Sequence, residues 1–222
     1  MSAFHLAEEL AILALNEKRG AYYASASSIL VYGLAGAELL ELVIGGRLAV
    51  EDKNLVVVDP TPVGDAVRDE ILNLMVIEKK PRKPYFWVVK LAHGIKRLKK
   101  IYPERLSAQG VLEIEPGRIL GLFPVTRYRL KDLMVKETIT ERLRDLVAYD
   151  PAPELQVICL LALISVSHLL KKVFIGEERK AAERKIRDWL KHSEERRDLA
   201  DVVIGVKKAI QAAEAAKHTA VG

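Results

Sequence analysis

The sequence has few of the features that mark secreted, disulfide-bonded or membrane-spanning proteins. Cys159 is the only cysteine among 222 residues, so no disulfide can form within the chain, and exposure to the cytosol is the simpler expectation. The amino-terminal segment has no basic stretch, and Glu8 and Glu9 interrupt its apolar residues. We therefore expect no signal peptide. The longest apolar run, residues 155–170, contains polar side chains and is shorter than the ~20 residues of a spanning helix. Any membrane contact should therefore be peripheral.

Signals of catalysis and metal binding are also scarce. The five histidines are scattered and show no metal-ligand spacing with the cysteine or with paired acids. The sequence has no nucleophile elbow, Walker loop or glycine-rich dinucleotide loop. Gly33 and Gly36 lie in an apolar helical segment, where small residues let helices pack closely. The acids near Asp65 are explained by helix capping, whereas Glu38 and Glu41 are harder to explain. We expect no enzyme, no metal site and no cofactor.

Composition indicates a folded, mildly basic protein. Half of the residues are apolar, and the formal net charge is +5. A chain of this length can bury a substantial core, and we expect one domain over residues 1–222. The positive charge favours anionic partners, either phospholipid or nucleic acid, without choosing between them.

Apolar periodicity predicts a mainly α fold of eight or so helices and two β-hairpins. The predicted helices cover residues 6–15, 29–44, 66–77, 85–102, 131–148, 151–174, 177–190 and 198–217. The predicted hairpins cover residues 47–58 and 111–123, and the second turns at Pro116-Gly117.

Five short segments carry a family resemblance. They are LAEEL at 6–10, GLAGAELLEL at 33–42, GRL at 46–48, DPTPVGD at 59–65 with the acids at 69–70, and GVL at 110–112. In order and spacing they resemble the Golgi phosphoprotein 3 family over about residues 6–210. The resemblance implies a compact helical fold with a helical bundle at its centre, amphipathic helices around it, and a β-hairpin used in self-association. In eukaryotes it also implies binding of phosphatidylinositol 4-phosphate and adaptor work that retains glycosyltransferases in the Golgi.

The resemblance carries over only part of the family's lipid pocket, which uses a tryptophan, an arginine and two further basic residues three apart on a later helix. A gapless match places Ala26 and Ala35 at the first two positions, where they supply neither an aromatic wall nor a charge. The match places Lys96 and Lys99 at the other two, which keeps the charge but loses the bidentate geometry of arginine. The resemblance therefore does not determine which lipid is recognised.

The basic segment 79–105 is the best functional candidate on physical grounds, since it holds ten cations and a single acid, Glu104. On the predicted helix, Lys96, Lys99 and Lys100 share one flank and can converge on a phosphate. The alternative is an ordinary solvated polar face. The residues that we assign to lipid head-group binding are Lys96, Lys99, Arg97 and Lys100, with Tyr22 and Tyr23 near enough in sequence to replace the aromatic wall.

The second hairpin, over residues 118–128, is the candidate oligomerisation element. Its apolar residues are Leu120, Leu122 and Phe123, and basic residues follow them. The family analogy favours contact with another subunit, and dipping into the head-group region is a second use. The alternative is a hairpin that folds on its own core.

These observations predict a peripheral membrane protein that binds acidic phospholipid head groups, either phosphatidylinositol 4-phosphate or a related anionic lipid. We expect it to be a cytoplasmic, homo-oligomeric adaptor for client membrane proteins, which would act at the Golgi only in a eukaryote. The chain begins close to the first family motif, so neither coat binding nor a Golgi address is carried over.

Two other functions compete with this prediction. The alternative is a nucleic-acid-binding protein, because helices followed by a hairpin over 85–123 resemble a winged helix. Against it, no base-reading set of Arg, Asn or Gln lines one helix face. An enzyme acting on a lipid or sugar would need a deep pocket with convergent acids.

Overall fold

The computed structural model describes residues 4–78, 80–95, 97–119, 122–149, 154–191 and 197–219. Within these ranges the protein is mainly α-helical, as the sequence predicts, with three small antiparallel sheets of two strands each. The helices are α1 (Leu6–Ala14), α2 (Ala24–Ser27), α3 (Leu30–Ile44), α4 (Ala66–Ile77), α5 (Pro84–Gly94), α6 (Leu98–Ala108), α7 (Met134–Tyr149), α8 (Leu155–Val166), α9 (Leu170–Val173), α10 (Gly176–Lys191) and α11 (Arg197–Thr219).

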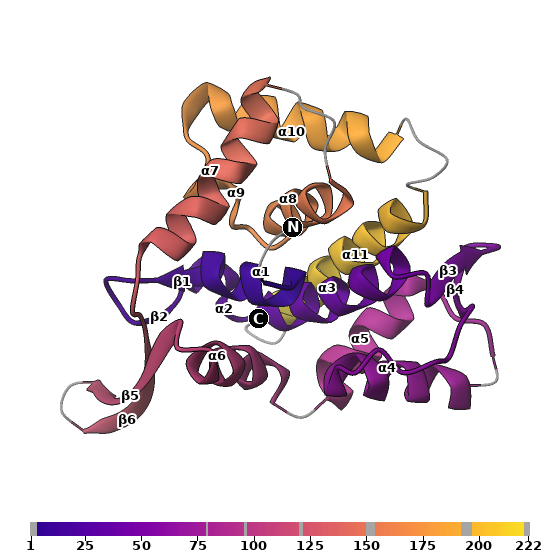
Figure 1. The fold of residues 1–222 in the computed structure, drawn as a ribbon, viewed down its shortest axis with the longest axis horizontal. Helices are drawn as coiled ribbons and strands as arrows, with labels where there is room; N and C mark the ends of the chain where they lie inside the picture. The colour runs from indigo at the N-terminus through magenta and orange to yellow at the C-terminus, as the bar shows by residue number, and fades with distance from the viewer. Residues whose placement is uncertain are drawn as a thin grey trace.

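The strands form three hairpins. They are β1 (Leu15–Asn16) with β2 (Ala21–Tyr22), β3 (Leu48–Glu51) with β4 (Asn54–Val57), and β5 (Leu112–Ile119) with β6 (Phe123–Leu130). In Figure 1 the β5–β6 ribbon extends from the body of the molecule beside α6, and β3–β4 lies at the opposite side near α11. The smallest pair, β1–β2, was not predicted, since two-residue strands carry no periodicity.

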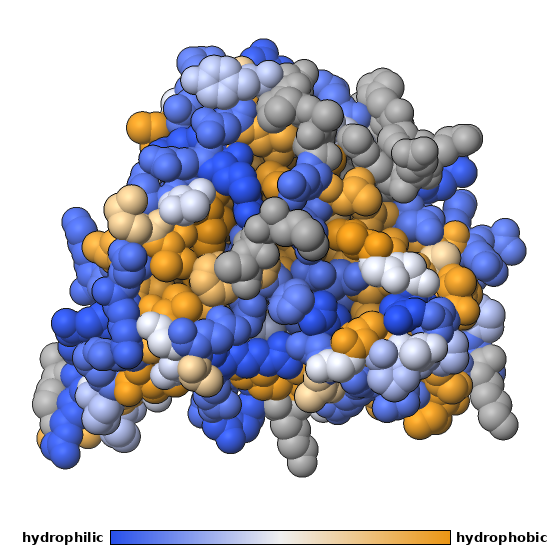
Figure 2. Space-filling model, in the orientation of Figure 1, coloured by the Kyte–Doolittle hydropathy of each residue, from blue (hydrophilic) through white to orange (hydrophobic). Residues whose placement is uncertain are grey.

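Helix α3 lies at the centre of the fold, between α1, α5, α8 and α11 (Figure 1). Between Leu30 and Leu42 all of its residues except Val31 are buried, which is the pattern of a helix surrounded by others. The apolar helix α8 is buried over Val157–Ile164 in the same way. On the face drawn in Figure 2, hydrophilic residues cover most of the surface and apolar residues gather between α7 and α8. The central helical bundle implied by the family resemblance is therefore present.

The glycines of α3 explain how closely its neighbours approach. A Cβ added at Gly36 would lie 2.2 Å from Cγ2 of Val206 on α11, and one at Gly33 would lie 2.7 Å from Oγ of Ser167. Both distances are too short for real contacts, so only glycine fits. The prediction that these small residues serve helix packing is confirmed.

The predicted helix 85–102 is wrong, because it is two helices, α5 and α6. Arg97 separates them with a left-handed backbone, φ +65°. The apolar positions nevertheless continue through the break, since Leu91, Ile95 and Leu98 are all buried. Apolar periodicity shows which side chains face the core but not whether the helix is continuous. Here the buried positions continue although the backbone turns at Arg97, so the pattern predicted one helix.

The turn predicted at Pro116-Gly117 is also wrong. Both residues lie inside β5, where Pro116 pairs with Thr126 and Gly117 with Val125. Each strand of an isolated two-stranded ribbon has an open edge, which tolerates the missing N–H of proline. The predicted helix 151–174 is likewise interrupted, between α8 and α9, where His168 has φ +58°.

The DPTPVGD loop and the acids around it cap a helix, as predicted. Asp65 is the N-cap of α4, and its carboxylate accepts from the backbone N–H groups of Val67 and Arg68 at 3.0 and 3.1 Å. Asp69 accepts from the backbone N–H of Val63 at 2.7 Å, which holds the loop against the helix start.

Candidate functional site

The candidate head-group site lies where α6 meets β2 and α2. Lys99, in the first turn of α6, places its Nζ 5.9 Å from the centroid of the Tyr22 ring, and this ammonium donates to the carbonyl oxygen of Ser27. The Tyr22 hydroxyl donates in turn to the carbonyl oxygen of Lys99 at 3.3 Å. Two regions far apart in the sequence, residues 22–27 and the start of α6, thus hold one cation against one aromatic ring.

A second tyrosine extends this aromatic surface. The rings of Tyr22 and Tyr128 have centroids 5.7 Å apart and are tilted by 40°. The backbone N–H of Tyr128 donates to the carbonyl oxygen of Gly20 at 2.8 Å, so β6 is fixed to the turn between β1 and β2. Burial raises the pKa of both phenols, so each keeps its hydroxyl proton at physiological pH.

Two other predicted cations, Arg97 and Lys100, lie at the start of α6. Arg97 pairs with Glu104 at 2.8 Å, and because both side chains are more than half exposed the pair contributes little. Lys100 is exposed, and its side chain forms no ion pair or hydrogen bond within the described part of the chain. Lys96 lies outside the described residues. The prediction that Lys96, Lys99 and Lys100 share one flank assumed an unbroken helix, whereas α6, which carries Lys99 and Lys100, begins at Leu98.

Part of the remaining basic segment is paired with acids of the protein. Lys90 pairs with Glu78 at 3.0 Å, and Arg105 pairs with Asp65 at 2.7 Å. Burial alone would raise the pKa of Asp65, but the hydrogen bond from Arg105 lowers it to about 2. Among the described residues of the segment, Lys80, Lys83 and Lys100 are exposed without an ion pair, and only Lys100 of these lies beside Lys99.

The family match puts two alanines where the family's lipid pocket has a tryptophan and an arginine, and the structure gives the burial of both. Ala26 and Ala35 are both fully buried, so neither faces a ligand. The Tyr23 ring contacts Lys136 and Lys172, whose Nζ atoms are 5.2 and 4.6 Å from its ring centroid. Of the two tyrosines, Tyr22 is the one beside Lys99.

The tip of the β5–β6 ribbon exposes large apolar side chains. Leu122 and Phe123 are 78% and 61% exposed, whereas Leu120 lies outside the described residues. Such exposure at a ribbon tip is typical of a contact surface.

The two acids that lacked a sequence explanation form a buried network. Glu38 accepts a 2.7 Å hydrogen bond from the Tyr102 hydroxyl, and Glu41 accepts one of 2.8 Å from the backbone N–H of Leu6. Arg68 lies 3.6 Å from Glu38 and 3.5 Å from Glu41. Burial raises the pKa of Glu38 to about 7. These acids join α1, α3, α4 and α6, which is a structural role.

Sequence reasoning missed Ser27, which accepts from Lys99, and Tyr128, whose ring contacts that of Tyr22. Ser27 contributes through its main-chain carbonyl, which has no side-chain signature. Tyr128 lies between Arg127 and Arg129 in a segment that sequence reasoning treated only as basic. Its contact with Tyr22 depends on the pairing of β5 with β6. Separately, none of the helices in the described ranges is long and apolar enough to cross a membrane.

Comparison with known families gives one match. The model of the family described as Golgi phosphoprotein 3 (GPP34) matches residues 6–213. A search of curated proteins found no match.

Proposed function

The chain belongs to the Golgi phosphoprotein 3 (GPP34) family, and we propose that it is a peripheral membrane protein that binds acidic phospholipid head groups. Membership of the family fits a Golgi adaptor role. The observation that carries the lipid proposal is Lys99, held over the Tyr22 ring next to the exposed Lys100. The ligand class is phosphatidylinositol 4-phosphate or a related anionic lipid.

The geometry suits a phosphate group at a membrane surface. The Lys99 ammonium carries three N–H groups, and the Ser27 carbonyl oxygen accepts from one of them. Lys100 and Arg97 add diffuse attraction, about 1 kcal/mol for each cation close to an anionic surface. This attraction decays over a Debye length of roughly 8 Å at physiological salt, so the binding should be sensitive to salt.

Head-group selectivity must come from residues other than the two alanines, since Ala26 and Ala35 are buried. Tyr22 offers a ring face, and the neutral hydroxyl of Tyr128 offers a donor and an acceptor. We propose that this pair takes the place of the family's tryptophan and first arginine. The substitution of lysine for a bidentate arginine favours recognition of charge over recognition of shape.

The β5–β6 ribbon supplies a second proposed contact. Leu122 and Phe123 at its exposed tip would be covered either by the same ribbon of another subunit or by the head-group region. We favour self-association through residues 118–128, which would multiply weak head-group contacts. Client membrane proteins would then be held by the assembled adaptor.

The test is co-sedimentation of the purified protein with three kinds of vesicle at low and at physiological salt. The vesicles contain neutral lipid alone, neutral lipid with phosphatidylserine, or neutral lipid with phosphatidylinositol 4-phosphate. Binding to an anionic vesicle that persists at physiological salt supports the proposal. Absence of binding to all three overturns it, and a gel shift with competitor DNA at the same salt would then test the nucleic-acid alternative.

A further inference from the structure

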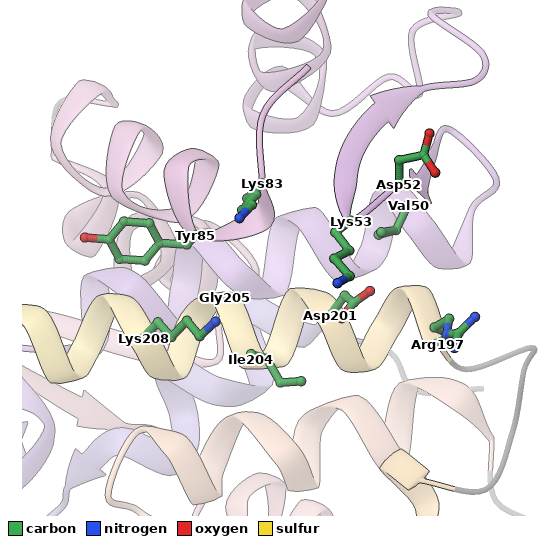
Figure 3. Close-up of a pocket in the computed structure, with 10 residues that line it drawn as sticks. All are labelled: Val50, Asp52, Lys53, Lys83, Tyr85, Arg197, Asp201, Ile204, Gly205 and Lys208. Carbon is green, nitrogen blue, oxygen red and sulfur yellow. The ribbon is translucent and has the colours of Figure 1, made fainter. Parts of the chain in front are cut away.

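A cleft of about 580 Å³ lies at the opposite side of the fold from the β5–β6 ribbon. Its walls are the β3–β4 hairpin, the first turn of α5 and the amino-terminal half of α11 (Figure 3). The charged residues that line it are Lys53, Lys83, Arg197 and Lys208, together with the acids Asp52 and Asp201. None of the residues assigned to the head-group site lines this cleft.

The four cations that line the cleft outnumber its two acids. Among the described residues, none of the four takes part in an ion pair or a side-chain hydrogen bond, although two carboxylates line the same space. Figure 3 shows Lys53 on the hairpin turn and Lys208 on α11 approaching the cleft from its two sides. Cations that gather in a concave site with an excess over acids create a positive potential that an anion relieves.

The walls of the cleft are fixed to one another. The backbone N–H of Val50 donates to the Asp198 carboxylate at 3.0 Å, which holds the hairpin on α11. Leu55 N–H donates to the Arg82 carbonyl oxygen at 2.8 Å, which holds the hairpin on the segment before α5. A Cβ at Gly205 would lie 2.8 Å from the backbone nitrogen of Tyr85, so α11 and α5 touch through their backbones. A site built on fixed elements loses little conformational entropy when a ligand binds.

The turn of the β3–β4 hairpin carries one of the cations of the cleft, Lys53. Asp52 and Lys53 have φ values of +47° and +65°, the left-handed region that a two-residue hairpin turn requires at both positions. Glycine or asparagine adopts this conformation more easily than lysine. In this chain the second position carries Lys53, whose side chain lines the cleft.

We propose that this cleft binds a phosphorylated organic molecule that carries at least two negative charges. Lysine and arginine together supply the several donors that phosphate oxygens accept. The organic part would lie against Tyr85 and Ile204, which are 39% and 44% exposed at the cleft. Asp201 can accept hydrogen bonds from hydroxyl groups of the ligand, which suits a sugar-containing compound. The volume is in the range of small-molecule sites.

A phosphate ester of this kind can come from a free metabolite or from a lipid head group, and two assays distinguish these sources. Amide NMR at physiological salt is recorded with pyrophosphate and with AMP as soluble probes. Co-sedimentation uses phosphatidylcholine vesicles that contain phosphatidic acid, a lipid phosphomonoester. The test variant is Lys53→Glu with Lys208→Glu. The control is Lys171→Glu with Lys207→Glu, which changes the charge equally on exposed residues that do not line the cleft.

The expected result is a saturable shift of the amides of Lys53, Tyr85 and Gly205 with a soluble probe. Affinity should fall by at least about tenfold in the test variant, because two charge-assisted contacts are lost, and should stay within about twofold in the control. Vesicle binding that depends on the same two lysines would assign the head-group source, and vesicle binding that does not would assign a free ligand. The proposal is overturned if neither the soluble probes nor the phosphatidic acid vesicles bind through Lys53 and Lys208, or if both variants weaken binding equally. The head-group function rests on other residues and stands or falls separately.

Discussion

The Nζ of Lys99 lies 5.9 Å from the centroid of the Tyr22 ring, and the Tyr22 hydroxyl donates to the backbone of Lys99. The cation and the ring therefore hold each other in place across 77 residues of sequence. The proposed lipid function depends on this pair.

Replacement of Tyr22 separates the role of the ring from that of the hydroxyl. Tyr22→Phe keeps the ring and removes the donor, so affinity for anionic vesicles should stay within about twofold of the wild type. Tyr22→Ala removes the ring, and affinity should fall by about 3- to 10-fold, since a cation–π contact is worth roughly 0.5–2 kcal/mol. Vesicle titration measures both. Equal losses in the two variants would show that the ring is not the recognition element.

The exposed ribbon tip should matter for assembly and not for folding. Leu122→Ser with Phe123→Ser removes apolar surface that is already in water, so the melting temperature should change little. Sedimentation velocity should show a shift from larger to smaller species relative to the wild type. An unchanged distribution of species would argue against self-association through this ribbon.

The close approach of α3 and α11 predicts a destabilised variant. Gly36→Ala places a Cβ 2.2 Å from Cγ2 of the stiff Val206 side chain, so α11 must shift, and the free energy of unfolding should fall by about 1–3 kcal/mol. Gly94→Ala is the matched control, because a Cβ there meets no atom within 4 Å. Urea denaturation compares the two. Similar stabilities for both variants would contradict the packing described for α3.

Glu38 should make stability depend on pH. Its pKa rises from 4.5 to about 7 on folding, so the folded state binds the proton more tightly than the unfolded state. The contribution of Glu38 is therefore fully present below pH 4.5 and is lost as the pH rises through about 7. Glu38→Gln cannot titrate, and a glutamine carbonyl can still accept from Tyr102.

The comparison of these two proteins gives the test. The difference in unfolding free energy between Glu38→Gln and the wild type should increase in favour of the variant by about 3 kcal/mol between pH 4.5 and pH 8. Urea denaturation at several pH values measures it. A difference that does not change with pH would show that Glu38 titrates normally.

Much of the fold could be predicted from sequence, and the site much less so. The N-cap Asp65 and the helix after it are determined by neighbouring residues, so the local sequence was sufficient to predict them. The break at Arg97 was missed because the core-facing row of apolar residues runs through it. The ribbon turn was missed because Pro116-Gly117 satisfies turn rules yet lies in an open-edged strand. Lys99 was identified by family resemblance, but its contacts with Tyr22 and Ser27 arise only from tertiary packing.

Charge reversal at the candidate site tests the central claim most directly. Vesicle co-sedimentation at physiological salt compares the wild type, Lys99→Glu with Lys100→Glu, and the control Lys171→Glu with Lys207→Glu, after circular dichroism has confirmed that all three are folded. The proposed function predicts that binding to anionic vesicles is lost only in the Lys99/Lys100 variant. Binding that survives in that variant, or that both variants lose equally, would contradict the assignment of Lys99 and Lys100 to the head group.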